Sequence, residues 1–177
     1  KEDVYNLCIK TAEMNRDAFD EDDEHRLLID VSRGVLGIYE GINGIHQGYN
    51  LIIADFPLKW TVQGMGKLFT TGINNVITNQ KVIPAHLMDP KIKNRSRLFY
   101  LMANIEASLF KGENNWPLML DTDGYIAEGS GDNFFIVKND TVISPEGRNM
   151  LRGISRDYVM NDLCKQLNIE VIYNWAL

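Results

Sequence analysis

Apolar and polar residues follow two spacings along the chain, and together they predict a mixture of helices and strands. Steps of three and four residues between apolar positions, typical of a helix with one buried face, run through 4–18, 94–109 and 155–167. Shorter apolar runs bounded by turn-forming residues predict strands. These strands lie at 27–32, 50–56, 72–78, 117–120, 126–128, 133–137, 142–144 and 169–173, with 65–69 as a weaker strand.

Glycine-containing segments between these elements predict the connections. Five glycines between residues 34 and 48 are too dense for a helix, so we expect a connecting loop there. Asp123-Gly124 and Asn139-Asp140 are turn pairs, and they predict that 117–145 is a meander of short strands. Ser155 stands where a helix N-cap is expected, with Asp157 in the first turn.

Composition adds a size and a class to this pattern. A chain of 177 residues with 45% hydrophobic and 24% charged residues fits about one globular domain. The net charge is −6, and the acidic excess falls in the run 17–24, which lacks the spacing of a calcium loop and is interpreted as a solvated surface loop. Because no cluster of Lys and Arg offers a surface for phosphates, nucleic acid binding is disfavoured.

Cysteine usage and hydropathy indicate where the protein works. Cys8 and Cys164 are far apart in the sequence and lie inside apolar helical patterns, as reduced cysteines of intracellular proteins do. No apolar run approaches the roughly 18 residues of a membrane span, and the first residues do not resemble a signal peptide. We therefore expect a cytoplasmic protein that does not bind membranes.

Residue chemistry alone leaves the active site open. The three histidines have no nucleophile motif beside them, and no His or Cys pair has metal-ligand spacing, so neither a hydrolase nor a metal site is predicted. Glu128 ends a strand before a glycine-containing turn and suits either a ligand contact or the satisfaction of loop N–H groups. Gly153-Ile154-Ser155 opens a helix and suits either a phosphate or an ordinary helix start.

Three motifs in a fixed order resemble a known family. They are Pro-Lys-Ile-Lys-Asn-Arg-Ser-Arg at 90–97, Asp-Gly-Tyr-Ile-Ala-Glu-Gly-Ser-Gly-Asp-Asn-Phe-Phe at 123–135, and Leu-Arg-Gly-Ile-Ser-Arg-Asp at 151–157. This order resembles the fold-type IV pyridoxal-phosphate enzymes, which include branched-chain and D-amino-acid aminotransferases and aminodeoxychorismate lyase. The resemblance extends from about residue 50 to residue 173.

The resemblance implies a fold and a domain organisation. We expect an α+β fold with a largely antiparallel, barrel-like sheet and flanking helices. Residues 1–40 would be the end of the N-terminal small domain with the interdomain loop, and 41–177 most of the cofactor-binding large domain. Because the family's N-terminal domain and C-terminal end have no counterpart in this sequence, we expect a fragment that alone would retain cofactor weakly.

The resemblance also assigns roles to individual residues. Lys93 would bind pyridoxal 5'-phosphate covalently and move protons, with Lys91 as the rival lysine. Glu128 would face the pyridine nitrogen and keep the ring protonated. Gly153, Ile154 and Ser155 would hold the phosphate at the helix start. The family often has threonine in place of Ser155 and proline in place of Arg152.

The activity that the resemblance favours is transamination of branched-chain L-amino acids with 2-oxoglutarate, by a homodimer. The alternatives are 4-amino-4-deoxychorismate lyase, a D-amino-acid aminotransferase, and a non-catalytic binding protein on the same fold. Branched-chain enzymes carry a tyrosine five residues after the lysine, where this chain has Leu98. That difference leaves the subfamily open.

Overall fold

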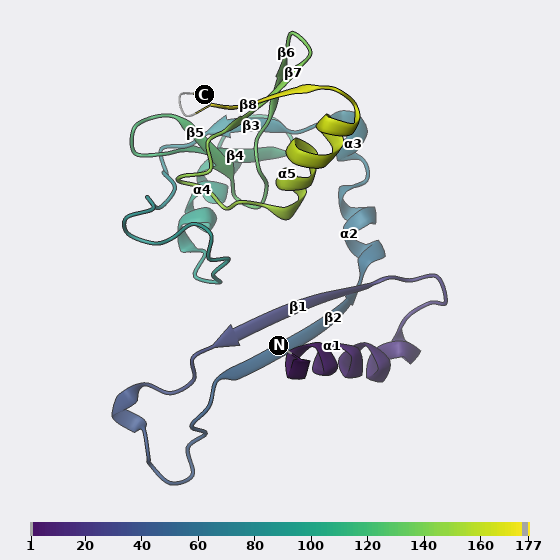
Figure 1. The fold of residues 1–177 in the computed structure, drawn as a ribbon, viewed down its shortest axis with the longest axis vertical. Helices are drawn as coiled ribbons and strands as arrows, with labels where there is room; N and C mark the ends of the chain where they lie inside the picture. Colours follow the sequence, from purple (N-terminus) through teal and green to yellow (C-terminus); the bar gives the residue numbers. More distant parts are fainter. Residues whose placement is uncertain (1, 175–176) are drawn as a thin grey trace. The chain divides into compact units, whose positions relative to one another are not determined.

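The computed structural model describes residues 2–174 and 177, and it divides into two compact units (Figure 1). The first unit ends at Thr71 and the second begins at Gly72. The domain boundary predicted after residue 40 lies in the loop between the first two strands and stays a prediction. Each unit is described by itself.

The first unit is a helix on a long two-stranded ribbon. Helix α1 (Glu2–Asn15) and the short η1 (Arg16–Ala18) precede β1 (His25–Ser32), which pairs antiparallel with β2 (Asn50–Pro57) along its whole length. Helix α1 contacts β2 and buries Cys8. The glycine-containing segment between the strands is a loop with one turn of 3-10 helix, η2 (Gly37–Tyr39), as predicted (Figure 1).

Two expectations for the first unit need correction. The weak strand predicted at 65–69 is wrong, because α2 (Leu58–Met65) and α3 (Leu68–Thr71) occupy that region. A short apolar run fits a helix or a strand equally well, so periodicity could not decide. The acidic run is also not wholly solvated, since Lys59 forms ion pairs with Asp20 and, at 2.9 Å, with Asp23, whose side chain is 4% exposed.

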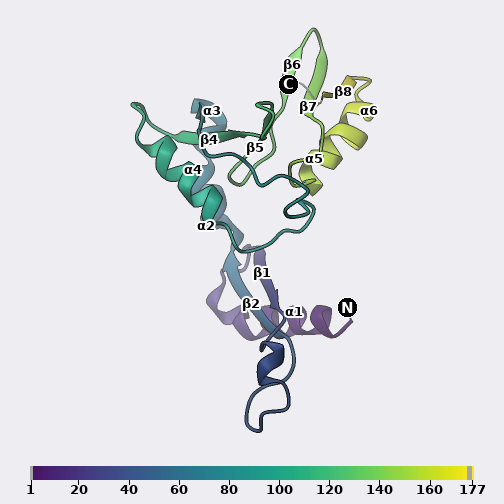
Figure 2. The ribbon, with the colours of Figure 1, turned by 90° about the vertical axis from the view of Figure 1, so that its left-hand side faces the viewer.

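The second unit contains two three-stranded sheets (Figure 2). One has the order β3 (Asn74–Ile77), β4 (Asn115–Leu120), β5 (Ile126–Gly129), and the other β6 (Ile136–Lys138), β7 (Thr141–Pro145), β8 (Glu170–Asn174). Helix α4 (Leu98–Ser108) packs against β4. Ala103 of α4, Met119 of β4, Ala127 of β5 and Val82 form a small core. The hairpins β4–β5 and β6–β7 of the predicted meander are present, but a single meander over 117–145 is wrong, because β5 and β6 lie in different sheets. The turn residues Asn139 and Asp140 have positive φ of 51° and 59°.

The fold class is confirmed as α+β, whereas a barrel-like sheet is not observed among the described residues. β4–β5 and β6–β7 are antiparallel, but β3–β4 and β7–β8 are parallel. A parallel pair needs a crossover connection, and each crossover here carries a helical segment. The three-stranded sheets are separate, and neither closes on itself.

Helix α4 buries a different face from the one that its apolar residues suggest. Ala103 and Ala107 are fully buried, and Phe99 and Tyr100 pack on the core. The residues of the predicted apolar face are exposed by 49 to 80%: Leu98, Leu101, Met102, Ile105 and Leu109. The alanines bring the helix backbone close to β4, which larger side chains at those positions would prevent.

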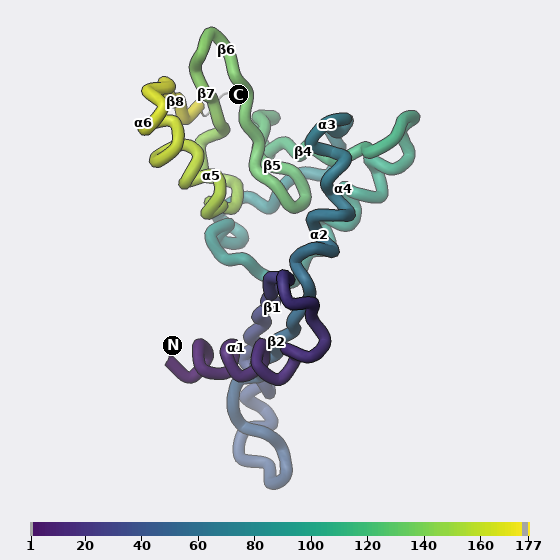
Figure 3. Tube along the Cα trace, turned by 90° about the vertical axis from the view of Figure 1, so that its right-hand side faces the viewer, coloured from purple at the N-terminus to yellow at the C-terminus, as the bar shows by residue number. Residues whose placement is uncertain are grey.

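The last helical run joins β7 to β8. It consists of α5 (Ile154–Tyr158), the π-helical η3 (Val159–Leu163) and α6 (Cys164–Gln166), which follow one another without a break (Figure 3). Gly153, and not Ser155, is the N-cap, so Ser155 lies inside the first turn. Within the described part of the chain, we find no helix with the length and apolarity needed to cross a membrane.

Candidate functional site

A cavity of about 700 Å³ lies entirely within the second unit. Its walls come from the segment before α4, the turn after β5 and the start of α5. This volume is in the range of roughly 300–1,000 Å³ that small-molecule sites occupy. The lining combines apolar side chains with a few charged and polar groups, which is the composition expected of a ligand site.

Glu128 is the buried acid of this cavity. It lies in β5 and is 5% exposed. Its Oε1 accepts a hydrogen bond of 2.6 Å from the Tyr100 hydroxyl, and its Oε2 accepts one of 3.0 Å from the Leu151 backbone N–H. Burial raises the pKa of Glu128 above its ordinary value, while these two hydrogen bonds oppose the rise.

Two side chains beside Glu128, one in α4 and one in the residue before it, were not singled out in the sequence. Tyr100 is one of them, and burial and Glu128 together raise the pKa of its hydroxyl well above the usual range. The other is Arg97, whose guanidinium lies 4.5 Å from the centre of the Tyr100 ring and donates to the Ser130 carbonyl. Their three-residue spacing does not say which side of the helix meets β5, so the sequence alone did not single them out.

Close contacts surround Gly129, at the end of β5, and Gly153, before α5. A Cβ at Gly129 would overlap with the Asp132 carboxylate, and one at Gly153 would overlap with Asn133 Oδ1. Asn133 Nδ2 donates to the Leu151 carbonyl at 3.0 Å, and its backbone bridges to that of Glu128. Asn133 thus braces the turn against the segment before α5.

The start of α5 faces the cavity and is fixed by a buried arginine. Arg156 Nε donates to Ser144 Oγ at 2.9 Å, and its Nη2 donates to the Pro145 carbonyl at 2.6 Å. The first N–H groups of a helix have no acceptor within the helix, so those of Ile154 and Ser155 are available to an anion. Arg156 therefore ties this helix start to β7.

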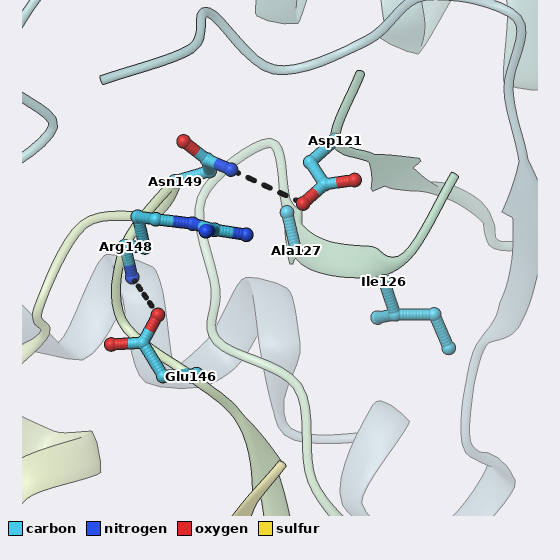
Figure 4. A pocket seen from close by; sticks show the side chains of 6 residues that line it. All are labelled: Asp121, Ile126, Ala127, Glu146, Arg148 and Asn149. Carbon is cyan, nitrogen blue, oxygen red and sulfur yellow. Dashed lines mark hydrogen bonds between the residues drawn. The ribbon is translucent and has the colours of Figure 1, made fainter. Parts of the chain in front are cut away.

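A hydrogen-bond network beside the cavity joins the segment before α4, the turn after β4 and the segment before α5, and Figure 4 shows part of it in a second pocket. Asn149 donates to Asp121 Oδ2 at 3.1 Å and accepts from the Ala85 N–H at 3.2 Å. Asp121 Oδ1 accepts from the N–H groups of Asp123 and Tyr125, which forms the turn after β4. Figure 4 shows the Asn149 side chain pointing toward Asp121, so this network holds the wall before α4 and the wall before α5 together.

All five residues that the sequence singled out line this one cavity. Lys93 is exposed in the segment before α4, Glu128 is buried in β5, and Gly153, Ile154 and Ser155 form the start of α5. Lys91, the rival lysine, also lines the cavity and is also exposed, so position alone does not choose between the two. The roles assigned to these residues stay predictions.

The second unit is an α+β domain whose loops enclose a cavity of the size that small-molecule sites have. The sequence profile described as amino-transferase class IV matches residues 2–175, and the chain belongs to that family.

Related sequences carry names of one kind. A protein of Methanocaldococcus jannaschii, named as a candidate branched-chain-amino-acid aminotransferase, is 30% identical over 175 residues, which are 97% of this chain and 55% of that protein. The branched-chain-amino-acid aminotransferase of Pseudomonas aeruginosa is 46% identical over 43 residues, which are 24% of this chain and 14% of that protein. The chain thus spans about half the length of the relative that it matches from end to end.

Solved structures show the same fold. The branched-chain amino acid aminotransferase of Escherichia coli superimposes with a TM-score of 0.76 at 26% identity, over 98% of this chain and 54% of that one. The branched-chain amino acid aminotransferase of Thermobaculum terrenum, in its PLP-form, superimposes with a TM-score of 0.73 at 21% identity, over 97% of this chain and 53% of that one.

Proposed function

We propose that this chain is the cofactor-binding part of a pyridoxal-phosphate aminotransferase that acts on branched-chain L-amino acids with 2-oxoglutarate as acceptor. The observation that carries the proposal is that a cavity lysine and a buried carboxylate line the same cavity in a member of amino-transferase class IV. The names of the relatives support the substrate class. The shared fold of the solved aminotransferases supports the reaction type.

The cavity suits pyridoxal phosphate in volume and in donor set. Glu128 offers a carboxylate for a protonated ring nitrogen, and the start of α5 offers N–H groups and the Ser155 hydroxyl for a phosphate. Gly153 keeps the backbone open where a side chain would collide with Asn133. Asn94 Oδ1 is buried in the same cavity wall and has no hydrogen-bond partner among the described residues, so it can accept from a bound ligand.

Lys93 carries the proton transfer in this proposal. When bound, pyridoxal phosphate withdraws electrons from the substrate α-carbon and makes its proton removable. The Lys93 Nζ atom, from a side chain that lines the cavity, would take that proton and return it during the exchange of amino groups. A lysine is suited to this task because its flexible side chain can reach both the cofactor and the substrate.

Glu128 supplies the electrostatic half of the site. An ionised carboxylate beside the ring nitrogen favours the protonated ring, which is the form that stabilises negative charge best. Burial strengthens this interaction because the local dielectric is low. The carboxylate must therefore be ionised in a place where burial raises its pKa.

We extend the proposal to a homodimer in the cytoplasm. The free cysteines Cys8 and Cys164 are both buried and unbonded to each other, as in reduced compartments. Homodimer formation is the expectation that comes with the family resemblance, and size-exclusion chromatography with light scattering on the full-length protein measures it.

Covalent trapping tests the lysine. The protein is incubated with pyridoxal phosphate, reduced with borohydride, and mapped by peptide mass spectrometry. We expect the pyridoxyl group on Lys93, the lysine that the family motif favours, and Lys93→Ala should lose both the adduct and transamination.

Lys91→Ala is the matched control, since Lys91 lines the same cavity and has the same side chain. It should keep the adduct and most of the activity. An adduct on Lys91, or transamination that survives Lys93→Ala, contradicts the assignment.

A comparison of leucine, valine, isoleucine and D-alanine as amino donors tests the substrate class. A preference for D-alanine would overturn the proposed substrate class.

A further inference from the structure

The Glu128 carboxylate is held from two sides by different parts of the second unit. Tyr100 approaches Oε1 from α4 at 2.6 Å, and the Leu151 N–H approaches Oε2 from the segment before α5 at 3.0 Å. Each carboxylate oxygen keeps a second lone pair, so a ligand nitrogen can still be accepted. The two donors therefore fix the plane of the carboxylate and leave it able to accept a hydrogen bond from a ligand.

The groups around Glu128 act on its pKa in opposite directions. Burial raises its pKa, and the nearby Asp132 carboxylate raises it further. The Tyr100 and Leu151 hydrogen bonds lower the pKa, and so does the positive charge of Arg97. Among these opposing groups, Tyr100 makes the shorter hydrogen bond, and short hydrogen bonds to a charged acceptor are the strong ones.

Tyr100 is itself held in place as a neutral donor. Its ring is stacked by the Arg97 guanidinium, whose distance to the ring centre is 4.5 Å, and it contacts the Phe99 ring at 4.0 Å between centres. Arg97 is in turn fixed by its bond to the Ser130 carbonyl in the turn after β5. Burial and Glu128 raise the pKa of the Tyr100 hydroxyl, so the hydroxyl keeps its proton throughout the neutral range.

We propose that Tyr100 is a positioning residue that keeps Glu128 ionised and oriented toward the cavity through the hydrogen bond between its hydroxyl and Oε1. The inference rests on the proposed function, because the ionised carboxylate matters only if Glu128 faces a protonated ring nitrogen. Tyr100 needs no contact with the cofactor for this role. Neither the tyrosine nor its bond to Glu128 follows from the family motifs in the sequence.

Tyr100→Phe tests the inference in the cofactor-free protein, because it removes the hydroxyl and keeps the ring against Arg97 and Phe99. The titration of the Glu128 carboxyl is followed by carbon-13 NMR. We expect the midpoint to move up by about one pH unit, the effect of losing one hydrogen bond to a charged group. An unchanged midpoint in the folded variant overturns the inference.

Tyr158→Phe is the matched control, since Tyr158 is half exposed on α5, outside the cavity, and loses the same hydroxyl. It should leave the Glu128 midpoint where it is in the wild-type protein. A midpoint that moves equally in both variants shows a general effect on the fold and overturns the inference. Far-UV circular dichroism confirms that each variant is folded.

A second variant covers the case in which Tyr100→Phe does not fold. Incorporation of a ring-fluorinated tyrosine at residue 100 keeps the hydroxyl and makes it a stronger donor, so the Glu128 midpoint should move down instead of up. An unchanged midpoint would again overturn the inference.

The cofactor-loaded protein separates this inference from the proposed function. With nitrogen-15-labelled pyridoxal phosphate, the ring nitrogen should lose its proton at lower pH in Tyr100→Phe than in the wild type. If the wild-type protein forms no pyridoxyl adduct at all, the proposed function is wrong. The titration of Glu128 in the cofactor-free protein still tests whether Tyr100 lowers the pKa of that carboxyl.

Discussion

At the scale of single residues, the site is a set of charges whose positions are dictated by neighbours far away in the sequence. Lys93 and Glu128 could be singled out in the sequence because family motifs surround them. Tyr100 and Arg97 could not, since their importance depends on which face α4 turns toward β5. Burial of Glu128 likewise depends on tertiary packing, which no local pattern contains.

The buried carboxylate predicts a pH dependence of stability. The folded state keeps the Glu128 proton at pH values where the unfolded chain, with the ordinary pKa of 4.5, has lost it. The free energy of unfolding contributed by this group therefore falls as the pH rises above about 4.5 and through the raised pKa. Urea unfolding as a function of pH should show this decline in the cofactor-free wild type and a smaller one in Glu128→Gln.

Glu113→Gln is the control for that measurement, because Glu113 is an exposed acid in the segment before β4. Its pH profile should run parallel to that of the wild type. A Glu128→Gln profile that also runs parallel would mean that burial does not perturb the acid, and would remove the electrostatic argument for the site.

At the scale of elements, the turns were predicted best from the sequence, and the buried face of α4 was predicted worst. The strands between 115 and 145 were predicted because Asp123-Gly124 and Asn139-Asp140 favour turns by their own backbone conformations, and Gly124 has a φ of 92°. The strand at 65–69 was wrong because a helix and a strand fit so short a run equally well. The exposed apolar face of α4 could not be foreseen, since the sequence does not say which face meets β4.

The attachment of α5 to β7 can be tested at the same scale. Arg156→Met keeps the aliphatic part of the side chain and removes the hydrogen bonds to Ser144 and Pro145. We expect the free energy of unfolding of the second unit to fall by about 2 kcal/mol, because a buried carbonyl loses a charged donor. Urea unfolding followed by circular dichroism measures the loss.

Arg148→Met provides the comparison for this variant. Arg148 is exposed, and its nearest ionic contact, Asp123, is 3.9 Å away, so the change should cost less than about 1 kcal/mol. If both variants lose the same free energy of unfolding, the hydrogen bonds of Arg156 stabilise the second unit no more than an exposed arginine does.

At the scale of the whole molecule, the large cavity belongs to only one of the two compact units. Every residue that lines the large cavity belongs to the unit that begins at Gly72. Pyridoxal phosphate at 100 times its dissociation constant should stabilise that unit by about 2.7 kcal/mol, by mass action on the folded state. Limited proteolysis with and without the cofactor should show protection after residue 72 and unchanged cleavage before it.

Inorganic phosphate at the same concentration is the control for the proteolysis, because it has the anion without the ring. It should protect the second unit less. Equal protection by the two compounds would indicate a site for the phosphate group alone, and equal protection of both units would contradict the confinement of the cavity to one of them.

The parallel pairing of β7 and β8 links the start of α5 to a strand that does not line the cavity. The helical run 154–166 is the return path between the two strands, with Arg156 fastening its beginning to β7. An anion bound at the start of α5 would restrain it and so slow the fraying of β8, which follows the helical run. The amide hydrogens of β8 would then exchange more slowly with deuterium. Binding would then be detectable at amides that the ligand never touches.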